Sequence, residues 1–384
     1  MMNKTGFGFL RLKKQEGKDQ TIDFDLLNQL VDRFLSLGGE YFDTAYTYLE
    51  GESENALRKA LVERYPRSSF RIADKLPGYR VQKYEDCERF FQESLRRCGV
   101  DFFDVYMLHW LNDKNYAIAQ KTDQFRFLRE LKSQGRAKQI GFSFHDTADV
   151  LHQILEEHPE VDYVQLQINY LDWESESIQA KACYDVAKSY GKKIIIMEPV
   201  RGGLLANLPE NAAKLLLENR PQDSQAKWAM RFATDLDAVE TVLSGMRSIK
   251  EIEDNMAPMD PVSNEERELL FHCAERIRSD TAIACTACNY CASHCPKKIP
   301  ISRYFALYND LSRNTAEDWK IQPIYNNIAK THSKASDCIG CGACERNCPQ
   351  KLPIIVTLRK VAEMFEENTG LAPAERQVLK KKGK

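Results

Sequence analysis

Eight cysteines in two identical runs near the C-terminus constrain this chain more than any other feature of its sequence. The first run is Cys285-x2-Cys288-x2-Cys291-x3-Cys295-Pro296, and the second is Cys338-x2-Cys341-x2-Cys344-x3-Cys348-Pro349. Three thiolates at positions i, i+3 and i+6 can wrap three corners of a cubane iron–sulfur core. Structural zinc sites are the alternative, but zinc takes four ligands in paired spacings, so the third cysteine of each run would be redundant. The spacing therefore predicts two 4Fe-4S clusters.

The repeated run resembles the iron-binding sequence of bacterial two-cluster ferredoxins, in which the fourth ligand of each cluster comes from the other run. The resemblance implies that one cluster is held by Cys285, Cys288, Cys291 and Cys348, and the other by Cys338, Cys341, Cys344 and Cys295. Between the runs lie 42 residues, Pro296 to Asp337, more than in a compact ferredoxin. We expect a small α+β ferredoxin-like domain whose stability depends on iron.

The residues before this module alternate between strand and helix patterns. From residue 6 to about residue 259, short β-branched or aromatic runs alternate with amphipathic stretches, which is typical of a parallel sheet. Eight strands are expected, at Phe7–Leu10, Tyr41–Asp43, Phe70–Asp74, Phe103–Leu108, Lys138–Phe142, Tyr163–Gln167, Lys193–Met197 and Glu240–Leu243. Eight units in about 255 residues match the usual size of a closed (β/α)8 TIM barrel. An open doubly wound sheet is the alternative.

Two prolines and a change in cysteine density predict where the first domain ends. Pro258 and Pro261 follow the last expected β/α unit, and the cysteine-rich segment comes after them. We therefore expect a barrel over residues 1–261. Residues 262–384 are expected to form a helical linker and the two-cluster domain.

Polar side chains stand at the C-terminal ends of three consecutive expected strands, where barrel enzymes carry their catalytic groups. Asp43 ends the second strand and is followed by Tyr48, Lys75 closes the third, and His109 closes the fourth. Here the sequence resembles the aldo-keto reductases, whose Asp-Thr-Ala-x-x-Tyr motif, Lys and His match these four residues. The likeness extends over residues 6 to about 255 and implies an oxidoreductase that interconverts a carbonyl and an alcohol.

The chemistry of hydride reduction explains why these four residue types occur together. A phenol with a pKa near 10 is a poor acid at neutral pH unless a cation stabilises its phenolate, and Lys75 would supply that charge to Tyr48. Asp43 would hold Lys75 in place, and His109 would orient the carbonyl oxygen. Taken singly, each residue also has a structural interpretation, such as a helix cap or a buried core histidine.

The same resemblance implies a nicotinamide nucleotide, NADP or NAD, although the residues that would bind it agree less well with the family. The matching positions are Ser143, Gln165, Gly245, Arg247 and Asn255. Phe144 stands where the family usually has Asn, and Met197 where many members stack a Tyr. Gly245 and Glu251 occupy positions at which many NADP-dependent members carry Lys and Arg. The choice between NADP and NAD therefore stays open.

Composition limits the partners and the location that we expect. The chain has 54 Lys and Arg against 56 Asp and Glu, a formal net charge of −2, which argues against a nucleic-acid binder. No run approaches the roughly 18 apolar residues of a membrane span, and the first residues lack the apolar stretch of a signal peptide. We expect a cytoplasmic protein with a small-molecule carbonyl or alcohol substrate, a redox partner protein, and no membrane association.

Three functions are compatible with a barrel and two clusters on one chain. Nicotinamide passes two electrons as hydride whereas each 4Fe-4S cluster passes one, so direct exchange needs an intermediate such as a flavin, for which no motif is readable. The first hypothesis is a reductase or dehydrogenase coupled to an electron relay. The second is a nicotinamide-dependent aldo-keto reductase with purely structural clusters. The third is a non-enzymatic electron-transfer or redox-sensing protein on a barrel scaffold.

Overall fold

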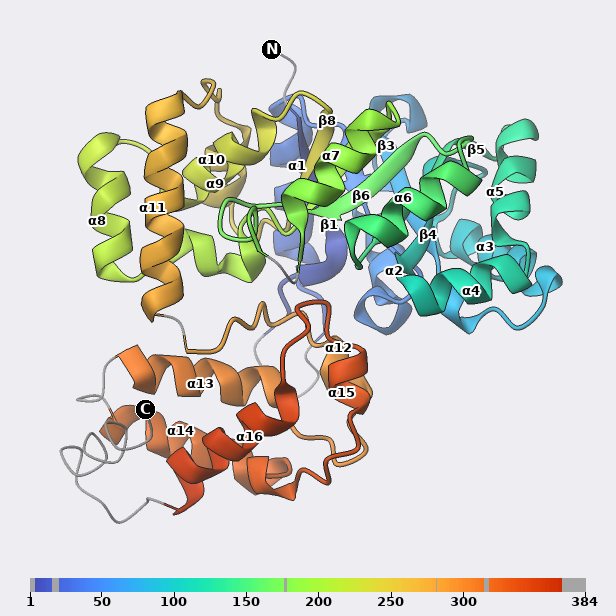
Figure 1. Cartoon of the computed structure of the whole chain (residues 1–384). Helices are drawn as coiled ribbons and strands as arrows, with labels where there is room; N and C mark the ends of the chain where they lie inside the picture. Colours follow the sequence, from blue (N-terminus) through green and yellow to red (C-terminus); the bar gives the residue numbers. More distant parts are fainter. Residues whose placement is uncertain (1–3, 16–20, 176–177, 281, 314–317, 368–384) are drawn as a thin grey trace. The chain divides into compact units, whose positions relative to one another are not determined.

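A computed structural model describes residues 4–15, 21–175, 178–280, 282–313 and 318–367 (Figure 1). The chain divides into two compact units. The first comprises Met1–Arg201, Leu205–Asn207 and Leu215–Phe271, and the second comprises Gly202–Leu204, Leu208–Lys214 and His272–Lys384. The division falls within helix α11 (Asn264–Asp280) rather than near residue 261, because Glu266 and Phe271 of this helix contact Arg231 and Phe232 of the first unit.

The first unit is a closed barrel of eight parallel strands in sequence order, as predicted. The strands are β1 (Thr5–Gly8), β2 (Tyr41–Asp43), β3 (Arg71–Leu76), β4 (Phe103–Leu111), β5 (Ala137–Phe144), β6 (Tyr163–Gln167), β7 (Lys193–Met197) and β8 (Val239–Ser244). The first and last strands close the barrel by pairing Gly6 with Leu243 and Phe7 with Ser244. The open doubly wound alternative is therefore excluded.

Helices surround the strands because each carries one apolar stripe that must be covered. They are α1 (Phe24–Ser36), α2 (Glu52–Leu57), α3 (Tyr84–Cys98), α4 (Asp113–Lys121), α5 (Gln124–Ser133), α6 (Ala148–Glu157), α7 (Ala180–Ser189), α9 (Gln225–Thr234) and α10 (Ile249–Met256). Helix α8 (Glu210–Asn219) is divided between the two units after Lys214. Helix α1 shows the local logic. The Asp23 side chain accepts the Leu26 backbone N–H at 3.0 Å to cap its start, and Gly38 takes a left-handed φ of 81° after its end.

The barrel interior contains a cluster of buried side chains from alternate strand positions. Seven residues form this buried cluster: Tyr41, Ala73, Val105, Met107, Tyr163, Ile195 and Leu243. Successive strand residues point to opposite faces, so a residue two positions further along shares the interior. The N-terminal end of the barrel opens into a wide cavity, whose wall includes Lys4, Arg71 and Glu240.

The second unit differs from the α+β expectation, because its described residues form helices and loops without a strand. The helices are α12 (Tyr290–Ser293), α13 (Ile301–Arg313), α14 (Asp318–Thr331), α15 (Ala343–Arg346) and α16 (Ile354–Ala362). The long segment between the cysteine runs supplies α13 and α14, which bury Tyr304, Phe305 and Tyr325 in a core shared with α16. No helix of the described ranges has the length and apolar character needed to cross a membrane.

Candidate active site and cysteine hollows

The four residues predicted as catalytic come together at the C-terminal end of the barrel. Asp43 lies two positions after Tyr41 of the interior cluster, Lys75 two after Ala73, and His109 two after Met107. The pleat of each strand therefore directs all three side chains to the inside of the barrel. Tyr48 follows in the 3-10 turn Tyr48–Gly51 after β2.

Lys75 is held at the centre of this group. Its Nζ lies 2.6 Å from Asp43 Oδ1 and donates a 2.7 Å hydrogen bond to the Thr44 carbonyl. The same Nζ lies 4.9 Å from the centre of the Tyr48 ring, and the Tyr48 and His109 rings meet edge to face at 5.5 Å. All four predicted residues are buried, with at most 9% of each exposed. The arrangement excludes most water and keeps the charged groups paired.

The electrostatics of Tyr48 differ from the sequence expectation. Burial raises the pKa of Tyr48 well above its usual 10, and the Asp43 carboxylate raises it further, whereas Arg11 opposes the shift. Lys75 does not reverse this shift, because its charge is paired with Asp43 at 2.6 Å. The phenol therefore stays protonated at neutral pH, as a proton donor must before reaction.

His109 is neutral at physiological pH. Burial lowers the pKa of His109 well below its usual value, and the positive charge of Lys75 lowers it further. Its Nδ1 is buried and has no hydrogen-bond partner. A neutral imidazole in this place can donate one hydrogen bond to a bound oxygen without carrying a charge.

Some of the predicted nucleotide-binding side chains already form hydrogen bonds within the chain, and others have polar atoms without such a partner. Gln165 on β6 is buried beside Asp43, and its Oε1 has no partner. The Ser143 Oγ already accepts the Trp110 backbone N–H at 2.7 Å. The Asn255 side chain donates to Ser244 Oγ at 2.8 Å and is buried, so it stabilises the junction of β8 and α10.

The remaining predicted positions lie around the start of helix α10. Gly245 directly follows β8, and Arg247 is exposed just before the helix. The Arg247 backbone N–H donates to Glu251 Oε2 at 2.6 Å, and the Glu251 N–H donates to the Ser248 side chain at 3.2 Å. A carboxylate of the chain itself thus occupies the helix N-terminus, where a phosphate would otherwise be favoured.

The structure adds residues at the barrel mouth that the sequence analysis missed. Arg11, after β1, forms a 2.7 Å ion pair with Glu198, after β7, and the two shift the pKa of Tyr48 in opposite directions. Tyr79 packs its ring 5.6 Å from Trp110 and 6.4 Å from His109. No local motif marks these residues, because strands far apart in the sequence bring them together.

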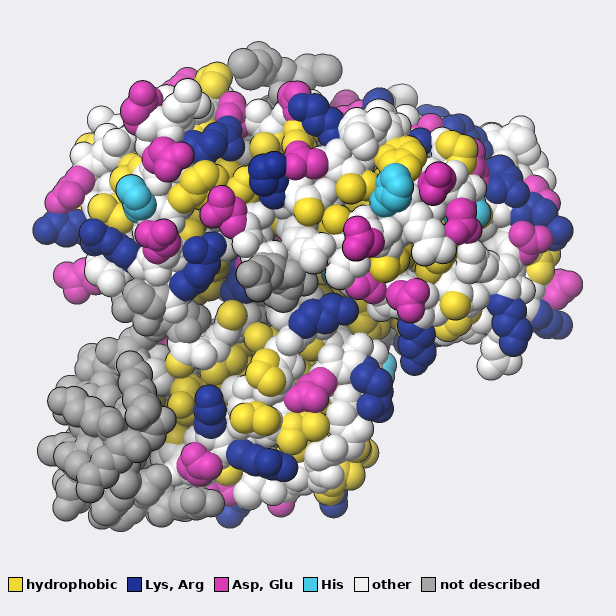
Figure 2. Space-filling model, in the orientation of Figure 1, with side chains coloured by type: hydrophobic (Ala, Val, Ile, Leu, Met, Phe, Trp, Pro, Cys, Tyr) yellow, Lys and Arg dark blue, Asp and Glu magenta, His cyan; other side chains and the backbone are white. Residues whose placement is uncertain are grey.

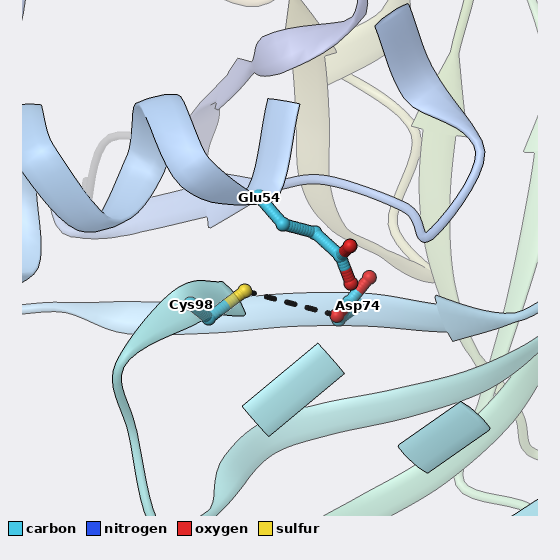
Figure 3. Close-up of side chains that lie close together, drawn as sticks. All are labelled: Glu54, Asp74 and Cys98. Carbon is cyan, nitrogen blue, oxygen red and sulfur yellow. Dashed lines mark hydrogen bonds between the residues drawn. The ribbon is translucent and has the colours of Figure 1, made fainter. Parts of the chain in front are cut away.

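A second polar group lies on the outer side of β3 and consists of Glu54, Asp74 and Cys98 (Figure 3). Ligand atoms of Glu54, Asp74 and Cys98 lie within 4.8 Å of one another, and all three side chains are buried. Glu54 Oε2 pairs with Arg97 at 2.9 Å, while Asp74 accepts the Lys75 backbone N–H at 2.7 Å. Burial and the Glu54 charge raise the pKa of Asp74 well above its usual value. Asp74 therefore holds a proton beside Glu54, which is paired with Arg97.

This proton predicts a pH dependence of stability. Because the folded pKa of Asp74 is raised, folding binds a proton, and the free energy of unfolding falls as pH rises from the ordinary carboxyl pKa towards the folded one. The Asn side chain of Asp74→Asn is neutral at every pH. We therefore expect the free energy of unfolding of this variant to fall less between pH 5 and pH 8 than that of the wild type. Thermal melts followed by circular dichroism measure this. Asp101→Asn, at an exposed carboxylate before β4, should keep the wild-type slope. An unchanged slope for Asp74→Asn would place the proton elsewhere.

The eight clustered cysteines line two separate hollows in the second unit. The wall of the first, here the Cys285 hollow, includes Cys285, Cys288, Cys291 and Cys348. The wall of the second, here the Cys341 hollow, includes Cys295, Cys338, Cys341 and Cys344. Each hollow thus combines three thiols of one run with the fourth thiol of the other. Four thiolates around one cavity are the donor set that a 4Fe-4S cluster takes.

The segment that follows β7 contributes to the second unit. Gly202, in the Gly202–Leu204 part of this unit, has a left-handed φ of 67° and lies against the Thr286 backbone. A Cβ on Gly202 would lie 2.2 Å from the Thr286 carbonyl oxygen, so only glycine fits here. Thr286 stands between the first two cysteines of the Cys285 hollow.

Comparison with known proteins gives a family for each part of the chain. A sequence profile of the Aldo/keto reductase family matches residues 4–269, which is more than half of the chain. A profile of a 4Fe-4S dicluster domain matches residues 284–352. The two profiles thus cover the barrel and the residues that line both cysteine hollows.

Individual relatives resemble the barrel part. An aldo-keto reductase from Mycobacterium avium is 28% identical over 219 residues, which cover 54% of this chain and 74% of that protein. The crystal structure of an aldo-keto reductase from Klebsiella pneumoniae in complex with NADPH superimposes with a TM-score of 0.58 at 17% identity, covering 70% of this chain and 90% of that one. The holo form of an aldo-keto reductase from Bacillus halodurans gives 0.57 at 23% identity, covering 70% and 91%.

Proposed function

Because the chain belongs to the aldo/keto reductase family, an oxidoreductase family, we propose that it interconverts a carbonyl and an alcohol at Tyr48. The proposal rests on one observation. Three strands and one turn supply the four residues: Asp43 lies in β2, Tyr48 in the turn after β2, Lys75 in β3 and His109 in β4. Their side chains meet in a buried group at the C-terminal end of the barrel. This geometry also argues against a non-enzymatic role for the barrel.

In the reductive direction the four residues have distinct tasks. Tyr48, kept protonated by burial, donates its phenolic proton to the carbonyl oxygen as negative charge develops there. Neutral His109 donates a hydrogen bond that orients the same oxygen. Lys75 Nζ, fixed by Asp43 and the Thr44 carbonyl 4.9 Å from the centre of the Tyr48 ring, is the nearby cation that partly offsets the negative charge left on the phenolate. In the oxidative direction Tyr48 takes the proton back.

A nicotinamide nucleotide supplies the hydride in this proposal. The chain offers the unpartnered Gln165 Oε1 at the nicotinamide end, next to Asp43, and solved relatives of the same fold include a complex with NADPH. Ser143 keeps its hydroxyl proton for donation while its oxygen accepts from Trp110. The Asn255 side chain already donates one hydrogen bond to Ser244 Oγ, so one of its amide protons is not available to the adenine.

Glu251 is expected to weaken the binding of NADPH, which carries one phosphate more than NADH. Its carboxylate lies at the N-terminus of α10, where it accepts the Arg247 N–H at 2.6 Å. We expect Glu251→Gln to lower the Kd for NADPH about fivefold and to change the Kd for NADH little, since one nearby charge pair contributes about 1 kcal/mol in water. Fluorescence titration with both nucleotides measures the change. Glu253→Gln, on the same helix but paired with Arg33 at 2.7 Å, is the matched control. An equal change for both nucleotides would contradict the assignment.

We further propose that the second unit holds two 4Fe-4S clusters that exchange electrons with the barrel reaction through an added carrier, such as a flavin, that takes two electrons as hydride and passes them on one at a time. When bound, such clusters each carry one electron at a time. Coupling is supported by the presence of both sites on one chain: four barrel residues meet in a buried group, and four cysteines line each of the two hollows. The alternative is an aldo-keto reductase whose clusters are structural.

One anaerobic experiment tests both parts of the proposal. The protein is purified without oxygen, its iron and sulfide are assayed, and it is mixed with NADH or NADPH while the visible absorbance is followed. Bleaching of the cluster absorbance by a nucleotide supports coupling. Nucleotide binding without bleaching supports structural clusters. If the nucleotide neither binds nor bleaches the absorbance, the nicotinamide reaction is contradicted. If the protein still contains no iron and no sulfide after reconstitution with both, the clusters are contradicted.

A further inference from the structure

The two cysteine hollows differ in how they meet the surface of the second unit. Cys341 is exposed, whereas the four cysteines of the Cys285 hollow are half-buried or buried. Ile339, which lines the Cys341 hollow, is 61% exposed. Val356 is 51% exposed and follows Ile355, another residue of that wall. The exposed large hydrophobic side chains among the described residues are Leu37, Leu217, Ile324, Ile339 and Val356. One of them lines the Cys341 hollow, and another directly follows a residue of its wall.

Basic side chains surround this apolar surface. Exposed cations around the Cys341 hollow are Lys297, which lines it, its neighbour Lys298, Arg346, and Arg359 and Lys360 on α16. Arg346 donates to the Cys341 carbonyl at 3.2 Å. Two carboxylates lie nearby, and each is engaged by backbone N–H groups: Asp337 accepts from Lys334, and Glu345 accepts from Ile355. Figure 2 shows hydrophobic and basic side chains, with a few acidic ones among them, on the visible face of this unit.

The Cys285 hollow has a different border. Its wall consists of uncharged residues, including Thr286, Asn289 and Phe305. Thr286 is 3% exposed, and Gly202 of the same unit packs against its backbone. The chain itself therefore covers part of this hollow. An outside molecule has easier access to the Cys341 hollow.

We propose that the surface formed by Lys297, Ile339, Cys341, Val356 and Arg359, the Cys341 face, is the docking site of an acidic one-electron carrier protein. The inference rests on the proposed function, because it needs a cluster in the Cys341 hollow. An apolar centre with a charged rim is the usual anatomy of a transient protein interface. The basic rim attracts a partner of opposite charge and speeds encounter. One electron passes between the reduced cluster and the oxidised one-electron centre of the carrier, and no bond is made or broken.

Charge reversal on the Cys341 face tests this proposal. The test variant is Lys297→Glu with Arg359→Glu, and the matched control is Lys330→Glu with Lys351→Glu. The control makes the same charge change on the same unit, but on α14 and beside Cys348 of the other hollow. Dithionite-reduced protein is mixed in a stopped-flow instrument with flavodoxin, an acidic one-electron carrier. We expect the test variant to be slowed about tenfold or more at low salt and the control less than twofold. Added salt should slow the wild type and reduce the difference.

Two further readouts keep the outcome interpretable. Iron content and the electron paramagnetic resonance spectrum should match among the wild type and both variants, which shows that the substitutions left the clusters intact. Binding of oxidised flavodoxin, measured by sedimentation, should weaken in the test variant without any turnover. If both variants have intact clusters, transfer electrons at the same rate and bind flavodoxin with the same affinity, the docking site is overturned but the proposed function is not. A wild-type protein without clusters would instead overturn the proposed function, and the docking site with it.

Discussion

Replacing Tyr48 by Phe is expected to lower carbonyl reduction about 10³-fold, because the variant loses the proton that the developing alkoxide needs. The aromatic ring stays, so its edge-to-face contact with His109 at 5.5 Å and the position of Lys75 Nζ 4.9 Å from the ring centre are retained. Nucleotide affinity and thermal stability should therefore change little. Steady-state kinetics with a panel of small aldehydes and ketones measures the loss.

Tyr46→Phe is the matched control for this substitution. Tyr46 lies two residues earlier, is equally buried, and donates its hydroxyl to Glu93 at 2.7 Å rather than to the catalytic group. We expect this variant to keep its turnover. If Tyr48→Phe retained a tenth or more of the wild-type rate, the proton would have to come from another group.

Substitution of Cys348 by Ser is expected to remove one cluster and to lower the bound iron from about eight to about four atoms per chain. Although Cys348 belongs to the second run, its side chain lines the hollow that holds Cys285, Cys288 and Cys291. Cys348→Ser and Cys285→Ser should therefore abolish the same spectroscopic signal. Cys344→Ser and Cys295→Ser should abolish the other. Iron analysis combined with electron paramagnetic resonance of the reduced variants distinguishes the two signals.

Pairing of Cys348 with Cys344 in this test would show that each run binds its own cluster and would contradict the exchange of ligands. Cys273→Ser is the control. This cysteine is buried, belongs to the second unit, and donates its thiol to the Ala212 carbonyl, a bond that a hydroxyl can also make. The control should retain all its iron. We also expect each cluster-deficient variant to unfold its second unit at lower temperature, because the lost cluster links two distant cysteine runs.

The barrel and its four central residues follow from patterns that are local in the sequence. Each strand is a short run with the two-residue period of a pleat, and the expected and observed strands overlap in all eight cases. The same period explains why Asp43, Lys75 and His109 share the interior, since each stands two positions beyond a residue of the buried cluster. This group of strand-end side chains is predictable because a closed barrel directs all of them to its interior at the same end.

Other features were not predictable because they depend on residues far apart in the chain. The long segment between the cysteine runs formed helices around Tyr304 and Tyr325, so the second unit is helical where an α+β fold was expected. The ion pair between Arg11 and Glu198 joins β1 to β7 across 187 positions of sequence. Such contacts have no spacing to recognise, because only the closed barrel brings their partners together.

The sequence by itself determined the closed barrel, the group of polar side chains at one end of it, and the division of eight cysteines into two runs, since each depends on residue types at short and regular spacing. The tertiary structure alone decided the upward pKa shifts of Tyr48 and Asp74 and the unequal exposure of the two cysteine hollows. These properties arise from burial and from the charges of distant neighbours. A side chain's solvent contact and electric field are set by the whole fold rather than by its adjacent residues.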